Sequence, residues 1–370
     1  MMTDKDIRRL VIKIGSNVLT RRDGRLDITR LSAIVDQVAE LRRRGIDVIL
    51  ISSGAVASGR GRIGGKIDVA LDDVSQRQLF SAVGQAWLIN RYYELFRDHD
   101  LVCGQVLTTK ENFATRRHYL NQKHCMEVML RCGVIPVVNE NDTVSVTELM
   151  FTDNDELSGL IATMMDADAL VILSNIDGLY TGDPADPASR LIPRIMPEDD
   201  MSQYITSSKS SAGRGGMATK YRIARKVASE GIAVVIANGK RDNILPRLVD
   251  GDPEAGSTTF VASDRRQTGV KKWIAHSESF AKGTLTVNDG AREALLSRDG
   301  ASLLAVGVTA VEGDFEKDDI VIVADSRGET VAWGRVAFDA QTARDMMGRG
   351  GEKPLVHADY LYIDDSRVFQ

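Results

Sequence analysis

Short apolar runs alternate along the chain with longer segments that have apolar residues at helical spacing. The runs are LVIKI, DVILIS, LVCGQVL, VIPVV, ALVILS and IAVVIA, and the helical segments between them include 28–44 and 75–96. Runs that are almost continuous in Val, Ile and Leu are typical of strands covered on both faces. The alternation predicts an α/β fold, a three-layer α/β/α sandwich with a mainly parallel open sheet.

The pattern changes after Phe260. The segment SDRRQTGVKKWIAH is polar and basic, which predicts a linker or an entry strand. Short strands with turn signals follow in GTLTVNDG, SLLAVGVTAVEG and DIVIVADSRGETVAWGRV, with one short helix over 291–297 and a hairpin turn over 325–328. We therefore expect a first domain over 1–260, a linker over 261–275 and a small β-rich domain over 276–370.

Composition fits a soluble globular protein. The 370 residues are 43% hydrophobic and 27% charged, and no apolar run is long enough to span a bilayer. We expect no signal peptide here, because the charged amino terminus leads directly into a strand. The 3 cysteines lack CxxC spacing, and the histidines show no metal-binding spacing. We expect a cytoplasmic protein without a protein-held metal, and the net charge of −5 gives no reason to expect a polyanionic partner.

Two strand ends carry unusual groups of polar side chains. NEND, residues 139–142, directly follows VIPVV, and the sequence FTDNDELS begins at Phe151. The carboxyl ends of parallel strands form the ligand crevice of such sheets. Asn and Asp oxygens accept hydrogen bonds from an ammonium group, and the Asn nitrogen donates to a carboxylate, so a zwitterion is a suitable ligand. TDNDELS also suits a helix amino terminus with an Asp or Asn cap, and we expect both roles.

Two further strand ends point to an anion. Lys13 lies inside the apolar strand VIKI, just before Gly15, where a glycine turn can present backbone N–H groups. The alternative is an edge-strand lysine that reaches solvent. In DVILISSGAVASGR a strand leads through Ser52, Ser53 and Gly54 into a helical segment, which is either an anion site or an ordinary serine cap.

Two glycine-rich segments need separate interpretations. GRGRIG, with Gly59, Gly61 and Gly64, lacks the strand and the acidic residue of a dinucleotide fingerprint, so we predict a surface loop. GRGGMATK leads into an amphipathic helix and places Lys220 in its first turn, where the helix dipole disfavours a cation. A nucleotide phosphate would relieve this, although the chain has no Walker sequence.

Together these segments resemble the amino acid kinase family. The resemblance runs through VIKIGSNVLT, ISSGAVASGR, QLFSAVGQAWLI, VIPVVNENDTV, TDNDELSGLIA, DGLYTGDP and GRGGMATK. The later segments GTLTVNDGAREALL and GASLLAVGVTAVEGDFEKDDIVIV resemble a PUA domain. The resemblance implies an amino acid kinase-like fold followed by a PUA-like barrel. It also implies transfer of the ATP γ-phosphoryl group to the side-chain carboxylate of L-glutamate, the first step of proline synthesis.

The resemblance also assigns roles to residues. Lys13 and Lys220 would neutralise the β- and γ-phosphates, and Asp155 would hold the two lysines. The glutamate-binding residues would be Ser53, Gly54, Ala55, Asn139, Asp142 and Asn154. The nucleotide-binding residues would be Lys13, Gly15, Ser174, Asn175, Arg214, Gly215, Gly216, Met217, Ala218, Thr219 and Lys220. Asn175 stands where the family usually has an acidic residue, and Ser257 stands where it usually has glycine.

The implied partners are ATP carrying Mg²⁺, proline as a feedback inhibitor, further copies of the chain in a dimer or tetramer, and glutamyl phosphate reductase. The alternatives are a sibling kinase for acetylglutamate, aspartate, carbamate or a nucleotide monophosphate, and a silent amino-acid sensor. RNA binding is a third alternative. From Ala275 onward the chain has 10 Lys and Arg against 17 Asp and Glu, a balance of −7, which disfavours RNA as the main ligand.

Overall fold

The computed structural model describes residues 7–66, 69–144, 153–204, 216–264, 269–275, 280–297, 301–351 and 353–363. The chain forms two compact units, one of residues 1–110 and 121–266 and the other of residues 111–120 and 267–370. Within the described residues, no helix combines the length and apolar character needed to cross a membrane. The predicted domain boundaries at 260 and 276 stay a prediction.

The first unit is built on an eight-stranded sheet with the order β3-β4-β2-β1-β5-β7-β8-β6. Its strands are β1 Arg9–Ile14, β2 Asp47–Ser52, β3 Val102–Thr108, β4 Val134–Glu140, β5 Ala169–Ser174, β6 Arg194–Ile195, β7 Ala233–Asn238 and β8 Ser257–Phe260. Neighbouring strands are parallel except for the pair β7 and β8. The predicted mainly parallel sheet is therefore confirmed, and each predicted apolar run forms one of its strands.

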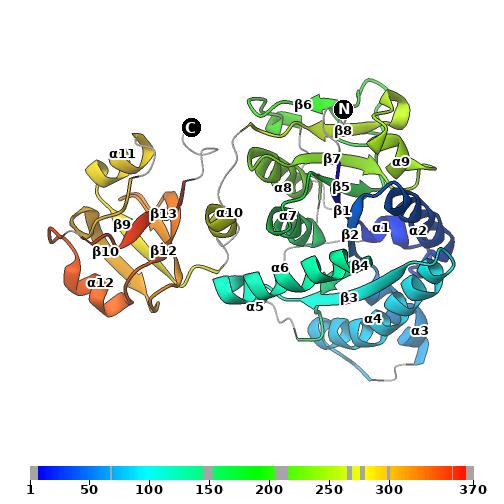
Figure 1. The fold of residues 1–370 in the computed structure, drawn as a ribbon, viewed down its shortest axis with the longest axis horizontal. Helices are drawn as coiled ribbons and strands as arrows, with labels where there is room; N and C mark the ends of the chain where they lie inside the picture. Colours follow the sequence, from blue (N-terminus) through cyan, green and yellow to red (C-terminus); the bar gives the residue numbers. More distant parts are fainter. Residues whose placement is uncertain are drawn as a thin grey trace. The chain divides into compact units, whose positions relative to one another are not determined.

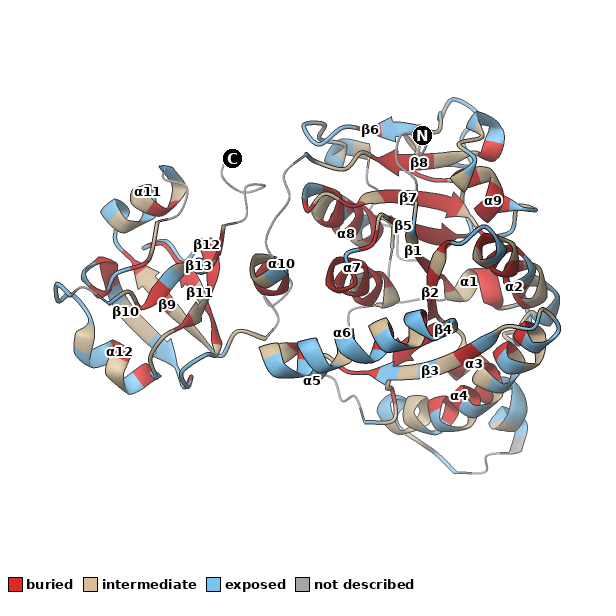
Figure 2. Ribbon diagram, viewed as in Figure 1, coloured by how far each residue is buried: buried red, intermediate tan, exposed pale blue. Residues whose placement is uncertain are grey.

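Helices cover both faces of this sheet (Figure 1). The helices of the first part of the chain are α1 Ser16–Leu19, α2 Ile28–Arg43, α3 Ala55–Ile63, α4 Asp73–Arg97, α5 Glu111–Ala114, α6 Arg116–Arg131, α7 Asn154–Met164, α8 Met217–Ser229 and α9 Ile244–Val249. In Figure 1, α7 and α8 lie on one face, and α1, α2 and α9 lie on the other. Figure 2 shows that the central strands are buried, as their near-continuous Val, Ile and Leu content requires.

The GRGRIG segment is helical, so the predicted surface loop is wrong. Gly59 and Gly61 lie within α3, and a 3₁₀ turn over Gly64–Lys66 follows. A Cβ atom on Gly59 would lie 1.9 Å from the carbonyl oxygen of Phe80. Here glycine serves close packing of α3 against α4, a purpose that the local sequence does not reveal.

The second unit contains a five-stranded sheet with the order β10-β9-β11-β12-β13. Its strands are β9 Gly283–Val287, β10 Val308–Gly313, β11 Ile320–Ala324, β12 Thr330–Val336 and β13 Val356–Ile363, and its helices include α10 Gly269–Ala275, α11 Asp289–Ser297 and α12 Ala340–Met346. The β-rich prediction is confirmed. The hairpin turn between β11 and β12 is also confirmed, with Gly328 at a φ of 82°.

Helix α10 corrects the prediction of a linker or entry strand in SDRRQTGVKKWIAH. Trp273, Ile274 and Ala275 are buried, and the Trp273 Nε1–H group donates to the carbonyl oxygen of Phe113 at 2.9 Å. Because polar residues flank this short apolar stretch, the sequence did not indicate a helix here. The helix packs within the second unit.

Candidate active site

Lys13 and Lys220 meet at one carboxylate, that of Asp155. Lys13 lies on β1, between β2 and β5, and is 5% exposed, so the edge-strand alternative is excluded. The Lys13 Nζ atom lies 2.6 Å from Asp155 Oδ1, and the Lys220 Nζ atom lies 3.0 Å from Asp155 Oδ2. We call Lys13, Asp155 and Lys220 the lysine trio.

The local helix geometry helps to stabilise the charges of the buried lysine trio. Asp155 lies in the first turn of α7, where the helix dipole favours a negative charge. Lys220 lies in the first turn of α8, where the dipole disfavours a positive charge, and its partner Asp155 offsets this cost. Burial alone would raise the pKa of Asp155, but the charges of Lys13 and Lys220 hold this pKa below its usual value.

Asp153 is a second carboxylate beside the lysine trio, and the sequence predicted it only as one of two candidate helix caps. Its Oδ1 atom accepts from the N–H groups of Asp155 at 2.9 Å and Glu156 at 3.1 Å, so it caps α7. Its Oδ2 atom is buried without a hydrogen-bond partner in the described part of the chain. Burial and the nearby charge of Asp155 raise the pKa of Asp153 to about 6.

A cluster of amide and hydroxyl groups adjoins the lysine trio along α7. The Asn154 Nδ2 group donates to Ser53 Oγ at 3.1 Å and to Asn139 Oδ1 at 3.1 Å. Ser53 leads into Gly54, which has a φ of 105° and directly precedes α3 at Ala55. The first N–H groups of a helix lack partners within the helix, so this turn can receive a carboxylate. Three predicted glutamate-binding segments thus converge.

Asp142, another predicted glutamate-binding residue, is held by a residue that the sequence did not indicate. Arg77 on α4 donates from Nε to Asp142 Oδ1 at 2.8 Å and from Nη2 to Glu140 Oε2 at 3.2 Å. The Ser81 hydroxyl donates to Asp142 Oδ2 at 3.2 Å. We call Arg77, Glu140 and Asp142 the acidic trio. An arginine on a helix is usually solvated, and only the motif QLFSAVGQAWLI, which begins directly after Arg77, indicated a role for this helix.

The predicted nucleotide-binding residues lie at the neighbouring strand ends. Gly15 follows β1 and donates from its N–H group to Leu173 O on β5 at 3.0 Å, and Ser174 and Asn175 come next along the chain. Gly216 precedes α8, and the first turn of α8 contains Met217, Ala218 and Thr219 before Lys220. Arg214 and Gly215 lie outside the described residues. No contact recorded for the described residues joins Ser174 or Asn175 to the lysine trio.

Thr258 has a structural role. It follows Ser257 in the GSTTF segment, where this sequence differs from the usual family pattern. Its hydroxyl accepts from Leu179 N at 2.8 Å and donates to Ile192 O at 2.6 Å, and it is buried. The segment forms β8. These contacts concern packing at the sheet edge.

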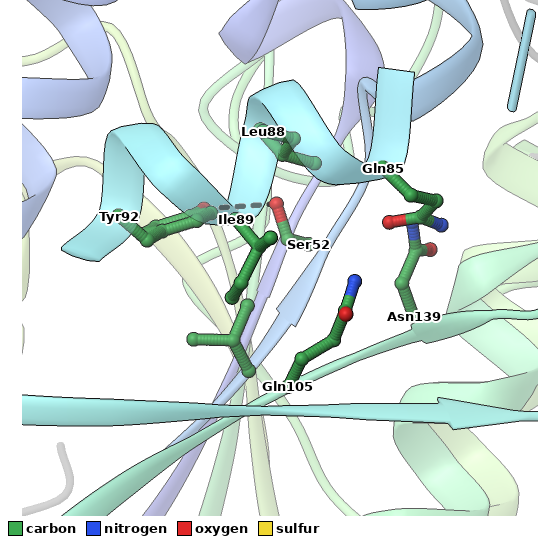
Figure 3. A pocket seen from close by; sticks show the side chains of 8 residues that line it. Ser52, Gln85, Leu88, Ile89, Tyr92, Gln105 and Asn139 are labelled. Atoms are coloured by element: carbon green, nitrogen blue, oxygen red, sulfur yellow. Dashed lines mark hydrogen bonds between the residues drawn. The ribbon is translucent and has the colours of Figure 1, made fainter. Parts of the chain in front are cut away.

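A small cavity lies behind Asn139, between α4 and the sheet (Figure 3). The space open to the centre of a water molecule is about 10 Å³, which is close to the room that one water needs. Its polar lining includes Gln85, Gln105 and the pair of Ser52 Oγ and Tyr92 OH, which lie 2.8 Å apart. This cavity is too small for an amino acid, so it supports the site from behind and does not bind the substrate.

Comparison with known proteins agrees with this geometry. The model of the amino acid kinase family matches residues 8–238, and that of the PUA domain matches residues 283–356. The glutamate 5-kinase of Bacteroides thetaiotaomicron is 62% identical over 360 residues, which cover 97% of this chain and 99% of that protein. The glutamate 5-kinase of Chlorobaculum tepidum is 45% identical over 358 residues, 96% of this chain and 97% of that protein.

Among solved structures, carbamate kinase from Giardia lamblia bound to AMP-PNP has a TM-score of 0.52 at 15% identity. The match covers 71% of this chain and all of that chain, and it supports the fold alone. The predicted resemblance to the kinase family and to the PUA domain is confirmed. The chain belongs to the amino acid kinase family, and a PUA domain follows its kinase domain.

Proposed function

We propose that this protein transfers the γ-phosphoryl group of ATP to the side-chain carboxylate of L-glutamate, which yields L-glutamyl 5-phosphate and ADP, the first step of proline synthesis. The observation that carries the proposal is the meeting of the Lys13 and Lys220 ammonium groups at Asp155, 2.6 Å and 3.0 Å from its oxygens. The relatives at 62% and 45% identity, both named glutamate 5-kinase, support the choice of substrate.

In the proposed reaction, a glutamate carboxylate oxygen forms a bond to the γ-phosphorus while the bond from that phosphorus to the β–γ bridging oxygen breaks. ADP leaves with the electron pair of the broken bond. The attacking carboxylate is already ionised near neutral pH, so the step needs no general base. Negative charge spreads over the transferring oxygens, and Lys13 and Lys220 stabilise it from fixed positions. Asp155 positions both lysines.

Glutamate binding uses the polar cluster at the strand ends. Asn154 already donates to both Ser53 and Asn139, and the three side chains offer donors and acceptors at the carboxylate ends of the substrate. The Gly54–Ala55 turn adds backbone N–H groups, and Asp142 accepts from the substrate ammonium. The nucleotide lies against Gly15, Ser174, Asn175 and residues 214–220.

Mg²⁺ enters this proposal with the nucleotide, as part of the substrate. Among the described residues, no group of three or more His, Cys, Asp or Glu side chains is arranged to hold a metal ion. The Asp153 Oδ2 atom is buried without a hydrogen-bond partner among the described residues, and it suits a contact to the solvated metal better than a resident metal site. When bound, the ion neutralises phosphate charge.

The assignment as a glutamate kinase also leads to proposals about inhibition, assembly and the fate of the product. We propose that proline inhibits by occupying the glutamate site and that the chain assembles into a dimer or tetramer. We also propose that the product passes to glutamyl phosphate reductase in the cytoplasm. We also propose a kinase domain over 1–260 and a PUA-like domain over 276–370, joined by residues 261–275, of which Gly269–Ala275 form helix α10.

A coupled assay of ADP release tests the proposal. The acceptors are L-glutamate, acetylglutamate, aspartate and carbamate, each with MgATP. We expect turnover with L-glutamate well above that with the other acceptors. The proposal fails if L-glutamate supports no ADP release while another acceptor does.

A further inference from the structure

Helix α4 presents a row of polar side chains to the turn that follows β4. Arg77, Ser81 and Gln85 are spaced four residues apart, so they share one face of the helix. Arg77 and Ser81 both donate to the carboxylate of Asp142, and Gln85 Nε2 donates to the backbone carbonyl of Glu140 at 3.2 Å. One helix face thus fixes the side chain and the backbone of the NEND turn.

Arg77 is the charged member of this row. Its Nε and Nη2 groups both contact Asp142, and Nη2 also contacts Glu140. The side chains of Glu140 and Asp142 are 4% and 7% exposed, against 24% for Arg77. Two carboxylates held so close repel each other, and the planar guanidinium can bridge them in a fixed geometry that a lysine ammonium does not reproduce. Glu140 and Asp142 together bring two carboxylates to this strand end, which suits a cationic ligand group.

The position of Arg77 is fixed by an unusually close contact between α4 and α3. A Cβ atom on Gly84 would lie 1.7 Å from the carbonyl oxygen of Ala55. The two helices therefore touch through their backbones, as their neighbouring positions in Figure 1 also show. Because α3 begins at the Gly54–Ala55 turn, α4 supports both that turn and the NEND turn.

We propose that Arg77 is a positioning residue for the amino acid substrate. It holds the Asp142 carboxylate where this group receives the substrate's ammonium, and it acts through Asp142 without contact to the substrate. The inference rests on the proposed function, because glutamate is the ligand that brings this ammonium.

Steady-state ADP release tests this in the full-length protein, with separate titrations of L-glutamate and MgATP. The variants are Arg77→Gln, Arg77→Lys and, as a control, Arg97→Gln. Arg97 is also an arginine of α4 but is exposed, and among the described residues its ion pair is a 3.9 Å contact to Asp98. We expect Arg77→Gln to raise KM for glutamate about tenfold, with kcat and KM for ATP nearly unchanged. Arg77→Lys keeps the charge and should rescue part of this loss, and Arg97→Gln should match the parent.

A double variant separates action through Asp142 from direct contact. If Arg77 acts through Asp142, Arg77→Gln combined with Asp142→Asn raises KM for glutamate no further than Asp142→Asn alone. Additive effects would instead indicate direct contact with the substrate and overturn the inference. Should Arg77→Gln not fold, Arg77→Lys takes its place, with an expected rise of about threefold.

Three results separate the role of Arg77 from the proposed function. An active parent whose KM for glutamate is unchanged by Arg77→Gln and by Arg77→Lys overturns the role of Arg77 alone. Equal changes in both KM values together with a lower melting temperature would show a general structural role and would also overturn it. A parent that releases no ADP with glutamate removes the proposed function, and the inference falls with it.

Discussion

The lysine trio and the acidic trio have opposite charge compositions. In the lysine trio, Lys13 and Lys220 share one carboxylate, and in the acidic trio, the guanidinium of Arg77 bridges Glu140 and Asp142. Both groups are largely buried, with side-chain exposures of 7% and 11% for the two lysines. A buried excess of charge is costly unless a ligand compensates it.

The difference suggests how one site orders two substrates. Two cations and one anion leave a positive excess in the lysine trio, which suits a phosphoryl group. The acidic trio presents the carboxylates of Glu140 and Asp142, which suit an ammonium. Glutamate carries its ammonium at one end and its reacting carboxylate at the other. The opposite charges therefore favour the orientation that directs the side-chain carboxylate toward the phosphate.

Loss of a lysine from the lysine trio should have the largest effect on activity. We expect Lys220→Ala to lower kcat by about a hundredfold to a thousandfold, since it removes a fixed charge that faces the transferring phosphoryl group. KM for glutamate should change far less. The matched control is Lys226→Ala, in the last turn of the same helix, which should keep the parent rate. A Lys220→Ala enzyme with near-parent kcat in the ADP assay would contradict the role of the lysine trio.

Asp153→Asn tests whether burial and the nearby charge of Asp155 disfavour an ionised Asp153 beside the lysine trio. Asp153 ionises with a pKa of about 6 in the folded protein, against an ordinary value of 3.8, so ionisation disfavours the folded state. The contribution of this group to stability is therefore full below about pH 4, falls as the pH rises to about 6 and is constant above. The difference between the two values corresponds to roughly 3 kcal/mol.

Asparagine retains the capping oxygen and removes this titration. We expect Asp153→Asn to gain stability relative to the parent between pH 4 and pH 7, measured by urea unfolding at several pH values. Asp155, with a lowered pKa, loses its stabilising effect only at more acidic pH and does not disturb this window. A constant difference across the range would mean that Asp153 titrates as an ordinary carboxylate and would contradict its raised pKa.

The sequence predicted the lysine trio and much of the fold, but of the acidic trio only Asp142 as a site residue. Lys13 was conspicuous because it interrupts an apolar strand, and Lys220 because it opposes a helix dipole. Arg77 had no such signal, since its partners depend on how closely α4 packs on α3. That packing depends on Gly59 and Gly84, and glycine in a sequence usually indicates a turn. Asp153 was recognisable as a cap, but its burial is a tertiary property.

Gly84→Ala tests whether the contact between α3 and α4 maintains the acidic trio. The added methyl group would meet the carbonyl of Ala55 at 1.7 Å, so the helices must separate. We expect a loss of about 2 kcal/mol in the free energy of unfolding and a higher KM for glutamate. Gly65→Ala is the matched control, because a Cβ atom there meets no atom within 4 Å, and it should lose no stability. A stable Gly84→Ala variant with unchanged KM would show that α4 does not need this close contact.

Proline should distinguish the two trios by binding only one of them. It has an ammonium and an α-carboxylate but no side-chain carboxylate, so we expect it to reach the acidic trio and not the lysine trio. Inhibition should then be competitive with glutamate and not with ATP. Asp142→Asn should weaken both glutamate and proline by a similar factor, about tenfold, because both lose the same charged hydrogen bond. Initial rates over a grid of glutamate, ATP and proline concentrations measure these effects. If proline at millimolar concentration leaves the rate unchanged, or competes with ATP, the acidic trio is not the common ammonium site.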